Sequence, residues 1–338
     1  MRSNVIKRLA WVTFLTGVFS ASQFSAHAAD LEPLRMQFGS IAVPAFAAPF
    51  LAKESGMYEK AGLKVDILPG RLSQDTVNAL VAGSADIGVV LAINHILSVD
   101  KGQKLVSVGN MYGGNAFGVI AAKETGIKNL LGLQGHKVLV PGASYEALLR
   151  ALIAQQGGNP DKVTYILIPQ PAAMLTAYAA KQADAVVTVI PFAQSGVEAT
   201  RPSVYMPFSK EGDPEPLYVW VVRPDVLAQK KGQIRKFLKA TYAATGMINA
   251  NPGVAINSFV KSVPGAVAER VVPDYAGWVP FQCAEGQTVV GRASDSAWKT
   301  AIDLYRKTRL ITSSLKSTDL YTNEFFDGAD PVSSAKCP

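Results

Sequence analysis

The pattern of hydrophobic and polar positions is clearest between residues 49 and 90. Apolar and charged residues alternate from 63 to 67, which is typical of a strand. Apolar residues then recur at the spacing of a helix, at Val77, Leu80 and Val81. Gly83 stands where a left-handed cap would end that helix, and a short apolar strand is expected at 86–90. The order helix, strand, helix, strand predicts an α/β fold with a mostly parallel sheet.

The same order returns in the middle of the chain. Further strands are expected at 34–38, 104–110, 117–122, 138–140, 163–168, 186–190 and 217–222. The stretch GSADIGVV at 83–90 is echoed by KQADAVVTV at 181–189. In both places an alanine-rich helix precedes an Ala-Asp pair, a short strand and a loop. The echo predicts two lobes built on one plan.

Ligands of open parallel sheets bind outside the carboxyl ends of the strands. In the first lobe the loops at those ends provide these candidate ligand-binding residues: Ser40, Ile41, Val43, Pro44, Arg71, Ser73, Leu91, Ala92 and Asn94. In the second lobe they provide Ser144, Tyr145, Gln170 and Phe192. Some of these loops lead into helix N-termini, whose free N–H groups suit anions.

Two alternatives remain open among these candidates. Arg71 is the only basic residue in the loops, so it either points inward and binds an anionic group or is a solvated surface arginine. Tyr145 or Phe192 could instead clamp an aromatic ligand. Trp278 and Phe281 lie in a proline-bounded segment, 273–282, which forms either a lip over the cleft or a loop packed on the first lobe.

Two phrases carry a resemblance to a known family. GMYEKAGLKV followed by ALVAGSADIG, at 56–65 and 79–88, is similar to the opening of type II solute-binding proteins of ABC importers. It most resembles the branch that binds aliphatic sulfonates, taurine, nitrate and the thiamine pyrimidine precursor. GLQGHKVLV and PGAS, at 132–144, resemble a second phrase of that family, with His136 where lysine is common.

The resemblance implies a two-lobed periplasmic binding protein in which two strands form a hinge between the lobes. Each lobe is then a mostly parallel sheet flanked by helices. We expect the chain to cross at 117–122 and to return at 217–222. The first lobe would take residues 29–120 and 222–338, and the second lobe residues 121–221.

The first 28 residues have the anatomy of a signal peptide. A basic start with Arg2, Lys7 and Arg8 precedes a mostly apolar stretch at 9–20 and the small-x-small residues 26–28. We expect cleavage after Ala28, export by the general secretion route and a periplasmic location; an uncleaved anchor helix is the alternative. Removing the three positive charges from the formal +7 leaves +4, without a clustered basic run, so no nucleic-acid partner is expected.

The reactive side chains are few. Cys283 and Cys337 are the only cysteines, and an oxidising compartment favours a disulfide between them over two separate thiols. Outside the signal peptide only His95 and His136 remain, far apart and without metal-ligand spacing. No metal or other cofactor is expected. Synthases of the thiamine precursor share the fold that the resemblance implies, but their histidine- and cysteine-rich motifs do not occur here, so catalysis is not expected.

The sequence therefore predicts a monomeric periplasmic component of an ABC importer. It would capture a small organic solute (a sulfonate, a nitrate-like anion, a pyrimidine or an aromatic or carboxylate compound) in the cleft between its lobes by hinge closure. It would then deliver the solute to a permease in the inner membrane. A ligand sensor that signals to a membrane receptor is the main alternative, and a secreted enzyme is the third.

Overall fold

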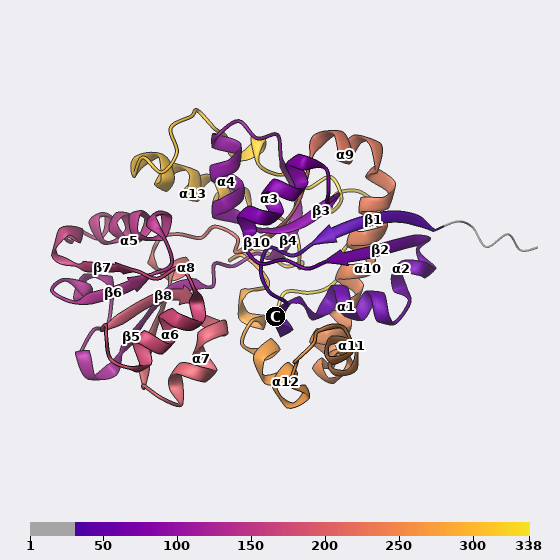
Figure 1. Ribbon diagram of the computed structural model, residues 1–338. Helices are drawn as coiled ribbons and strands as arrows, with labels where there is room; N and C mark the ends of the chain where they lie inside the picture. The colour runs from indigo at the N-terminus through magenta and orange to yellow at the C-terminus, as the bar shows by residue number, and fades with distance from the viewer. Residues whose placement is uncertain (1–30) are drawn as a thin grey trace, which may run out of the picture. The chain divides into compact units, whose positions relative to one another are not determined.

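The computed structural model describes residues 31–338, which contain two five-stranded mixed sheets flanked by helices (Figure 1). The predicted signal peptide and its cleavage site lie outside the described residues. The first sheet has the order β2-β1-β3-β10-β4. Its strands are β1 (Glu32–Gln37), β2 (Leu63–Leu68), β3 (Ile87–Leu91), β4 (Val106–Tyr112) and β10 (Tyr218–Val222).

The second sheet repeats this arrangement in the order β7-β6-β8-β5-β9. Its strands are β5 (Phe117–Ala122), β6 (Lys137–Val140), β7 (Thr164–Leu167), β8 (Ala185–Val189) and β9 (Ser203–Pro207). Each sheet has one reversed strand: β10 runs antiparallel to β3 and β4, and β5 runs antiparallel to β8 and β9. The reversed strand is in each case the first one after the chain has changed sheets, and the mostly parallel, two-lobed fold is as predicted.

The two crossings lie a few residues before their expected positions. Because β5 belongs wholly to the second sheet, the chain leaves the first sheet between Tyr112 and Phe117. Because β10 belongs wholly to the first sheet, the return is complete before Tyr218. The expected boundaries after residues 120 and 221 therefore fall inside strands rather than between the lobes.

Helices cover both faces of each sheet. Those of the second lobe are α5 (Ala143–Gln155), α6 (Pro171–Ala179), α7 (Ile190–Glu198) and α8 (Phe208–Glu211). Those of the first lobe are α1 (Ala47–Glu54), α2 (Met57–Lys60), α3 (Ser73–Ala82), α4 (Ala92–Asp100), α9 (Pro224–Gln229), α10 (Lys231–Ala250), α11 (Ile256–Ser262), α12 (Ala268–Ala276) and α13 (Asp295–Lys307). In Figure 1, α3 and α4 lie on one side of the first sheet and α1, α11 and α12 on the other. No helix among residues 31–338 is long and apolar enough to cross a membrane.

The repeated Ala-Asp pair occupies equivalent positions in the two lobes. Asp86 stands just before β3 and accepts a hydrogen bond from the backbone N–H of Arg35 on the neighbouring β1, at 2.8 Å. Asp184 stands just before β8 and accepts the equivalent bond from Lys137 on β6, at 2.9 Å. The backbone N–H of each aspartate bonds back to the carbonyl of the same partner, at 2.9 Å in both lobes. Each aspartate therefore joins its strand to the neighbouring strand at the edge opposite the predicted site.

Two segments differ from the expectation. The edge strand β9 was not predicted, because it is only five residues long and ends in proline. Pro273 lies inside α12 rather than in a loop. Trp278 is buried, with its ring centroid 5.2 Å from that of Tyr112, so it packs on the first lobe and does not form a lip.

A disulfide joins Cys283 to Cys337, the pairing that the sequence favoured, with 5.9 Å between the Cα atoms. It closes a loop of 54 residues. The adjoining Val289 and Lys336 form an antiparallel bridge. The C-terminal tail is therefore held against the first lobe by a covalent bond and by backbone pairing.

Candidate functional site

Ser73 joins the strand-end loops of the first lobe. Its buried hydroxyl donates to the carbonyl of Gly39 after β1, at 3.2 Å, and accepts from the backbone N–H of Leu91 at the end of β3, at 3.0 Å. Both hydrogen-bonding directions of the hydroxyl are thus used within the protein. Ser73 was predicted to contact a ligand, and its geometry instead suits holding three loops in register.

The loop after β1 has both exposed and anchored residues. Ile41 is 61% exposed, and the hydroxyl of Ser40 donates to its carbonyl at 3.0 Å. Val43 precedes a single 3-10 turn, Pro44–Phe46, in which proline occupies the first position. The missing N–H of proline costs nothing there. The loop therefore presents Ser40 and Ile41 at its outer part, while Val43 and Pro44 fix its entry into α1.

The residues after β3 have different roles. Ala92 is buried, and its backbone N–H donates to the carbonyl of Leu217 in the return crossing, at 3.0 Å. Leu91 and Asn94 are half-buried. The Asn94 carbonyl accepts a hydrogen bond from the Ser98 hydroxyl at 2.6 Å, and its side chain remains available for a ligand.

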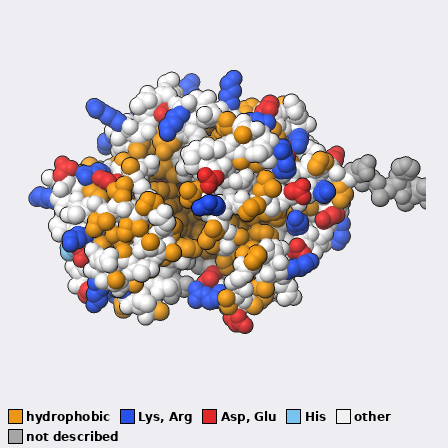
Figure 2. Space-filling model, in the orientation of Figure 1, with side chains coloured by type: hydrophobic (Ala, Val, Ile, Leu, Met, Phe, Trp, Pro, Cys, Tyr) orange, Lys and Arg blue, Asp and Glu red, His pale blue; other side chains and the backbone are white. Residues whose placement is uncertain are grey.

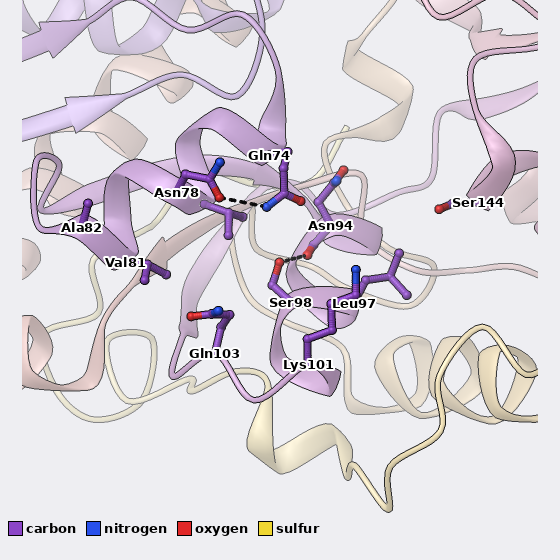
Figure 3. Close-up of a pocket in the computed structure, with 11 residues that line it drawn as sticks. Gln74, Asn78, Val81, Ala82, Asn94, Leu97, Ser98, Lys101, Gln103 and Ser144 are labelled. Atoms are coloured by element: carbon purple, nitrogen blue, oxygen red, sulfur yellow. Dashed lines mark hydrogen bonds between the residues drawn. The ribbon is translucent and has the colours of Figure 1, made fainter.

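A cavity of about 510 Å³ brings together two of the predicted residues, Asn94 from the first lobe and Ser144 from the second. It is lined by Gln74, Val77, Asn78, Val81, Ala82, Asn94, Leu97, Ser98, Lys101, Gln103 and Ser144. Figure 3 shows Ser144 across the cavity from Asn94 of α4. Lys101 and Gln103 line the cavity just after the C-terminal end of that helix. Its polar groups are mainly amides and hydroxyls, with Lys101 as the one charged residue of the lining.

Most of this lining comes from helix faces rather than from strand-end loops. Gln74 and Asn78 lie one turn apart on α3 and hydrogen-bond to each other at 3.1 Å. The expectation for this helix rested on its apolar stripe alone. Amide side chains four residues apart on its other face were the signal that could have identified the lining, since residues at this spacing share a face.

The candidate ligand-binding residues of the second lobe differ in their exposure. Tyr145 stacks on Phe117, with ring centroids 4.4 Å apart, and its hydroxyl is buried without a hydrogen-bond partner in the described chain. Gln170 is exposed before α6 and Phe192 is 38% exposed on α7. Tyr145 is thus a half-buried ring packed on Phe117 with a buried hydroxyl, whereas Phe192 remains available to a ligand.

Exposed apolar side chains occur at the strand ends of both lobes. They include Ile41 and Leu72 in the first lobe and Phe192 in the second. Figure 2 shows a hollow between the two halves with hydrophobic side chains on its walls. Arg71, next to Leu72, is exposed and makes no hydrogen bond or ion pair with any described residue. A guest with an apolar body and one polar end would match this surface.

The two crossings between the lobes are bonded to each other. Asn115 in the first crossing donates from Nδ2 to the carbonyl of Asp213 at 3.3 Å and to its carboxylate at 3.1 Å. Its Oδ1 accepts from the N–H of Phe117 at 3.0 Å. Asp213 and Glu215, in the return crossing, are both buried. Burial raises the pKa of Asp213 to about 7, against the opposing effect of the bonds from Glu215 N–H and Asn115. Burial, followed by the charge of Asp213, raises the pKa of Glu215 well above its usual range.

Neither histidine has the surroundings of a metal ligand. Burial lowers the pKa of His95 to about 4, and its Nε2 lies 2.8 Å from the carbonyl oxygen of Leu320. The Nδ1 of His136 lies 3.2 Å from the carboxylate of Asp184. Residues 31–338 contain no group of three or more histidine, cysteine, aspartate or glutamate side chains that could hold a metal ion.

Two similar sheets, joined by two crossings and sharing a cavity, define the two-lobed periplasmic-binding-protein fold. The family model for NMT1/THI5-like proteins matches residues 43–255, more than half of the chain. The chain belongs to this NMT1/THI5-like family.

Solved structures of binding proteins share the fold. The aliphatic sulphonate binding protein SsuA of Escherichia coli superposes with a TM-score of 0.68 at 19% identity, covering 88% of this chain and 99% of that one. The nitrate-binding protein NrtA of Synechocystis gives a TM-score of 0.62 at 15% identity, with 87% of each chain covered. At these identities the likeness concerns the fold.

Relatives by sequence include both binding proteins and enzymes. A Brucella abortus protein named "Putative binding protein" is 27% identical over 214 residues, which are 62% of this chain and 66% of the relative, just under two thirds of its length. The 4-amino-5-hydroxymethyl-2-methylpyrimidine phosphate synthase of Schizosaccharomyces pombe is 26% identical over 125 residues, 37% of this chain and 36% of that one.

Proposed function

We propose that this protein is the periplasmic solute-binding component of an ABC importer. It would capture a small organic solute in the cleft between its lobes and deliver it to a permease in the inner membrane. The observation that carries the proposal is the cavity of about 510 Å³, which is lined mainly by the first lobe and reached by Ser144 from the second lobe. Its volume lies within the range of small-molecule sites, about 300 to 1,000 Å³.

Lobe closure gives this arrangement its mechanism. Two crossings allow the lobes to move about a hinge with little change inside either sheet. A ligand that touches Asn94 and Ser144 at once makes both contacts only when the lobes are together, so binding shifts the population toward the closed form. A permease can then distinguish loaded from empty protein by shape.

For the ligand we propose an organic molecule with an apolar body and a polar or anionic end. Ile41, Leu72 and Phe192 offer apolar contacts, and Arg71 and Lys101 are the basic groups near the loops and the cavity. The structural likeness to sulfonate- and nitrate-binding proteins is compatible with an anionic group. An apolar body favours sulfonates, carboxylates or aromatic acids over nitrate.

We further propose that residues 1–28 direct export and that the mature monomer acts in the periplasm. Binding rather than catalysis is favoured by the structural neighbours SsuA and NrtA, which are binding proteins. The partial match to pyrimidine phosphate synthases makes turnover worth testing. Mass spectrometry of a bound ligand before and after incubation should show it unchanged; a new product would favour an enzyme.

A thermal-shift screen tests the binding proposal. The panel contains aliphatic sulfonates, nitrate, pyrimidines, carboxylates and aromatic acids. A ligand at 100 times its Kd stabilises the folded protein by about 2.7 kcal/mol. For a chain of this size that corresponds to a rise of roughly 5 °C in Tm. No shift with any compound, in protein shown by circular dichroism to be folded, would count against a small organic solute as the ligand.

Two amide substitutions test the location of the site. Asn94→Ala should weaken binding of a ligand found in the screen by about tenfold, since it removes one hydrogen bond of about 1 to 1.5 kcal/mol. The control Gln182→Ala removes an exposed amide between α6 and β8, at the opposite edge of the second sheet, and should leave affinity unchanged. Equal effects of both substitutions would place the ligand elsewhere. A pull-down from the membrane fraction then separates an importer from a sensor, because it recovers a permease in one case and a receptor in the other.

A further inference from the structure

Three buried polar atoms without hydrogen-bond partners in the described chain meet near the return crossing. They are Oε2 of Glu215 and the hydroxyls of Tyr145 and Tyr305. Tyr145 belongs to α5 of the second lobe and Tyr305 to α13. Glu215 and Tyr305 face each other closely enough for each to shift the pKa of the other, but no hydrogen bond of normal geometry from a described residue satisfies the three atoms. Buried polar groups are nearly always paired, so this poorly satisfied cluster indicates a site with a task beyond packing.

The helix α13 belongs to the first lobe. Trp298 of α13 packs edge-on against His95 of α4, with ring centroids 6.0 Å apart. Across the lobes, α13 and α5 line a shared surface groove of about 390 Å³, with Leu304 and Thr308 on one side and Ala147 and Ala151 on the other. The polar cluster is thus enclosed by elements that move with different lobes. Separation of the lobes would part these helices and admit water to Glu215.

Asp213 lies beside this cluster, and its charge acts on the carboxyl group of Glu215. The N–H of Glu215 donates to Oδ1 of Asp213 at 3.4 Å, and both side chains are at least nine-tenths buried. Neither carboxyl group forms an ion pair with any residue between 31 and 338. Two adjacent carboxylates in a dry site cannot both carry a charge, so the pair retains a proton.

The facing groups provide no compensating positive charge. Tyr145 faces the pair from α5, Tyr305 from α13, and Tyr218 of β10 faces Tyr145. Burial, followed by the charges of the acid pair, raises the pKa of Tyr305 well above its usual range. The groove has two basic residues, Arg150 and Lys307. Arg150 already pairs with Glu146 and Asp161, at 2.9 and 2.8 Å, and neither basic group forms an ion pair with Asp213 or Glu215.

We propose that Asp213 and Glu215 form a proton-controlled latch at the hinge: the pair holds a proton while the lobes are together, and loss of that proton favours their separation. When the lobes separate, water reaches both side chains and stabilises them as charged carboxylates. In the closed form the pair is buried and is stable only with a proton bound. Asn115 keeps the two crossings bonded in both states. A more acidic periplasm would therefore favour the closed form and retention of ligand, and a more alkaline one release.

The direction of the pH dependence follows from the linkage between proton binding and lobe closure. The enclosed pair binds protons more tightly than the hydrated pair, so its preference for the closed form is full below about pH 4, where a hydrated carboxyl is also protonated. The preference is lost as the pH rises through about 7, the value for Asp213. For one proton released, the ratio of closed to open protein falls up to tenfold per pH unit within this window.

Small-angle X-ray scattering of the ligand-free protein between pH 5 and pH 8 tests the latch. The radius of gyration of the wild type should increase with pH. The double variant Asp213→Asn/Glu215→Gln keeps the shapes of both side chains but has no proton to lose, so its radius should stay nearly constant. Each single variant keeps one buried carboxyl group, so its radius should change less with pH than that of the wild type; the single variants also serve if the double variant does not fold. Glu59→Gln is the matched control, because this carboxylate is exposed on α2 and forms no ion pair with any described residue, and it should respond like the wild type.

A wild-type radius that does not change with pH would overturn the latch, as would a response in the double variant Asp213→Asn/Glu215→Gln equal to that of the wild type. The latch rests on the lobe movement of the proposed function, but the measurement uses no ligand. A failed ligand screen therefore cannot account for a flat pH response, and a flat response leaves ligand binding untested.

Discussion

The echoed aspartates before β3 and β8 should contribute very differently to stability, although they make the same backbone bonds. The Asp86 side chain is 5% exposed, and that of Asp184 is 33% exposed. Asp86 also accepts from Arg35 Nη2 and from Lys230 Nζ, each at 3.0 Å. Among residues 31–338, Asp184 has only His136 as a side-chain partner, at 3.2 Å.

Asp86→Ala should lower the free energy of unfolding by about 3 kcal/mol. Breaking a buried ion pair costs about 3 to 5 kcal/mol. The expected loss for Asp86→Ala lies at the lower end of this range, because the Arg35 side chain is 43% exposed and can be rehydrated. Asp184→Ala should cost about 1 kcal/mol, the typical value of one hydrogen bond whose donor can be partly rehydrated. The expected difference is therefore about 2 kcal/mol.

Equilibrium unfolding in urea measures both losses, and pH provides a second test. Burial alone would raise the pKa of Asp86, but hydrogen bonds from Arg35 and Lys230 outweigh it, so the pKa is lowered. The stabilisation is therefore present above the usual aspartate pKa, about 3.9, and is lost as the pH falls through the lower native value. The cost of Asp86→Ala should shrink at low pH. Equal losses for the two alanine variants at pH 7 would refute this reasoning.

Two other predictions concern the tail and the loop that carries Arg71. Replacing both Cys283 and Cys337 by serine should lower the free energy of unfolding by about 4 kcal/mol in the chain-entropy model for a loop of this length, measured by urea unfolding, and added reductant should then have no further effect. Gly70→Ala should cost about 1 to 3 kcal/mol and weaken ligand binding, because a Cβ there would lie 1.6 Å from the carbonyl oxygen of Phe38. Gly142→Ala, in the loop after β6 of the second lobe, has open space for its Cβ and should leave both properties unchanged.

Much of the fold could be predicted because each strand and helix has its own hydrophobic period. The strand 117–122 was placed at its observed limits, and the echo of the Ala-Asp pairs correctly indicated two lobes of one plan. The crossings could not be placed as well. A fully apolar run such as 218–222 looks the same whether it passes between lobes or lies in the middle of a sheet. Only pairing with β3 and β4 identifies it as a sheet strand.

The candidate site was less predictable than the fold. Loops at strand ends can be found from topology, but the direction of their side chains depends on packing that local sequence does not encode. Ser73 illustrates this, since its hydroxyl bonds to two loops from other parts of the chain. The acid pair in the return crossing was missed for the same reason: Asp213 and Glu215 occur in a polar, proline-containing stretch that reads as an exposed loop, yet both are buried.

The central claim is that two lobes close on a small guest, and a change of shape on binding tests it most directly. Small-angle X-ray scattering of the protein, without ligand and saturated with a compound from the thermal-shift screen, measures that change at one fixed pH. We expect the radius of gyration to decrease on binding, and to decrease less with Asn94→Ala at the same ligand concentration. A ligand that binds tightly and leaves the radius of gyration unchanged would contradict the account.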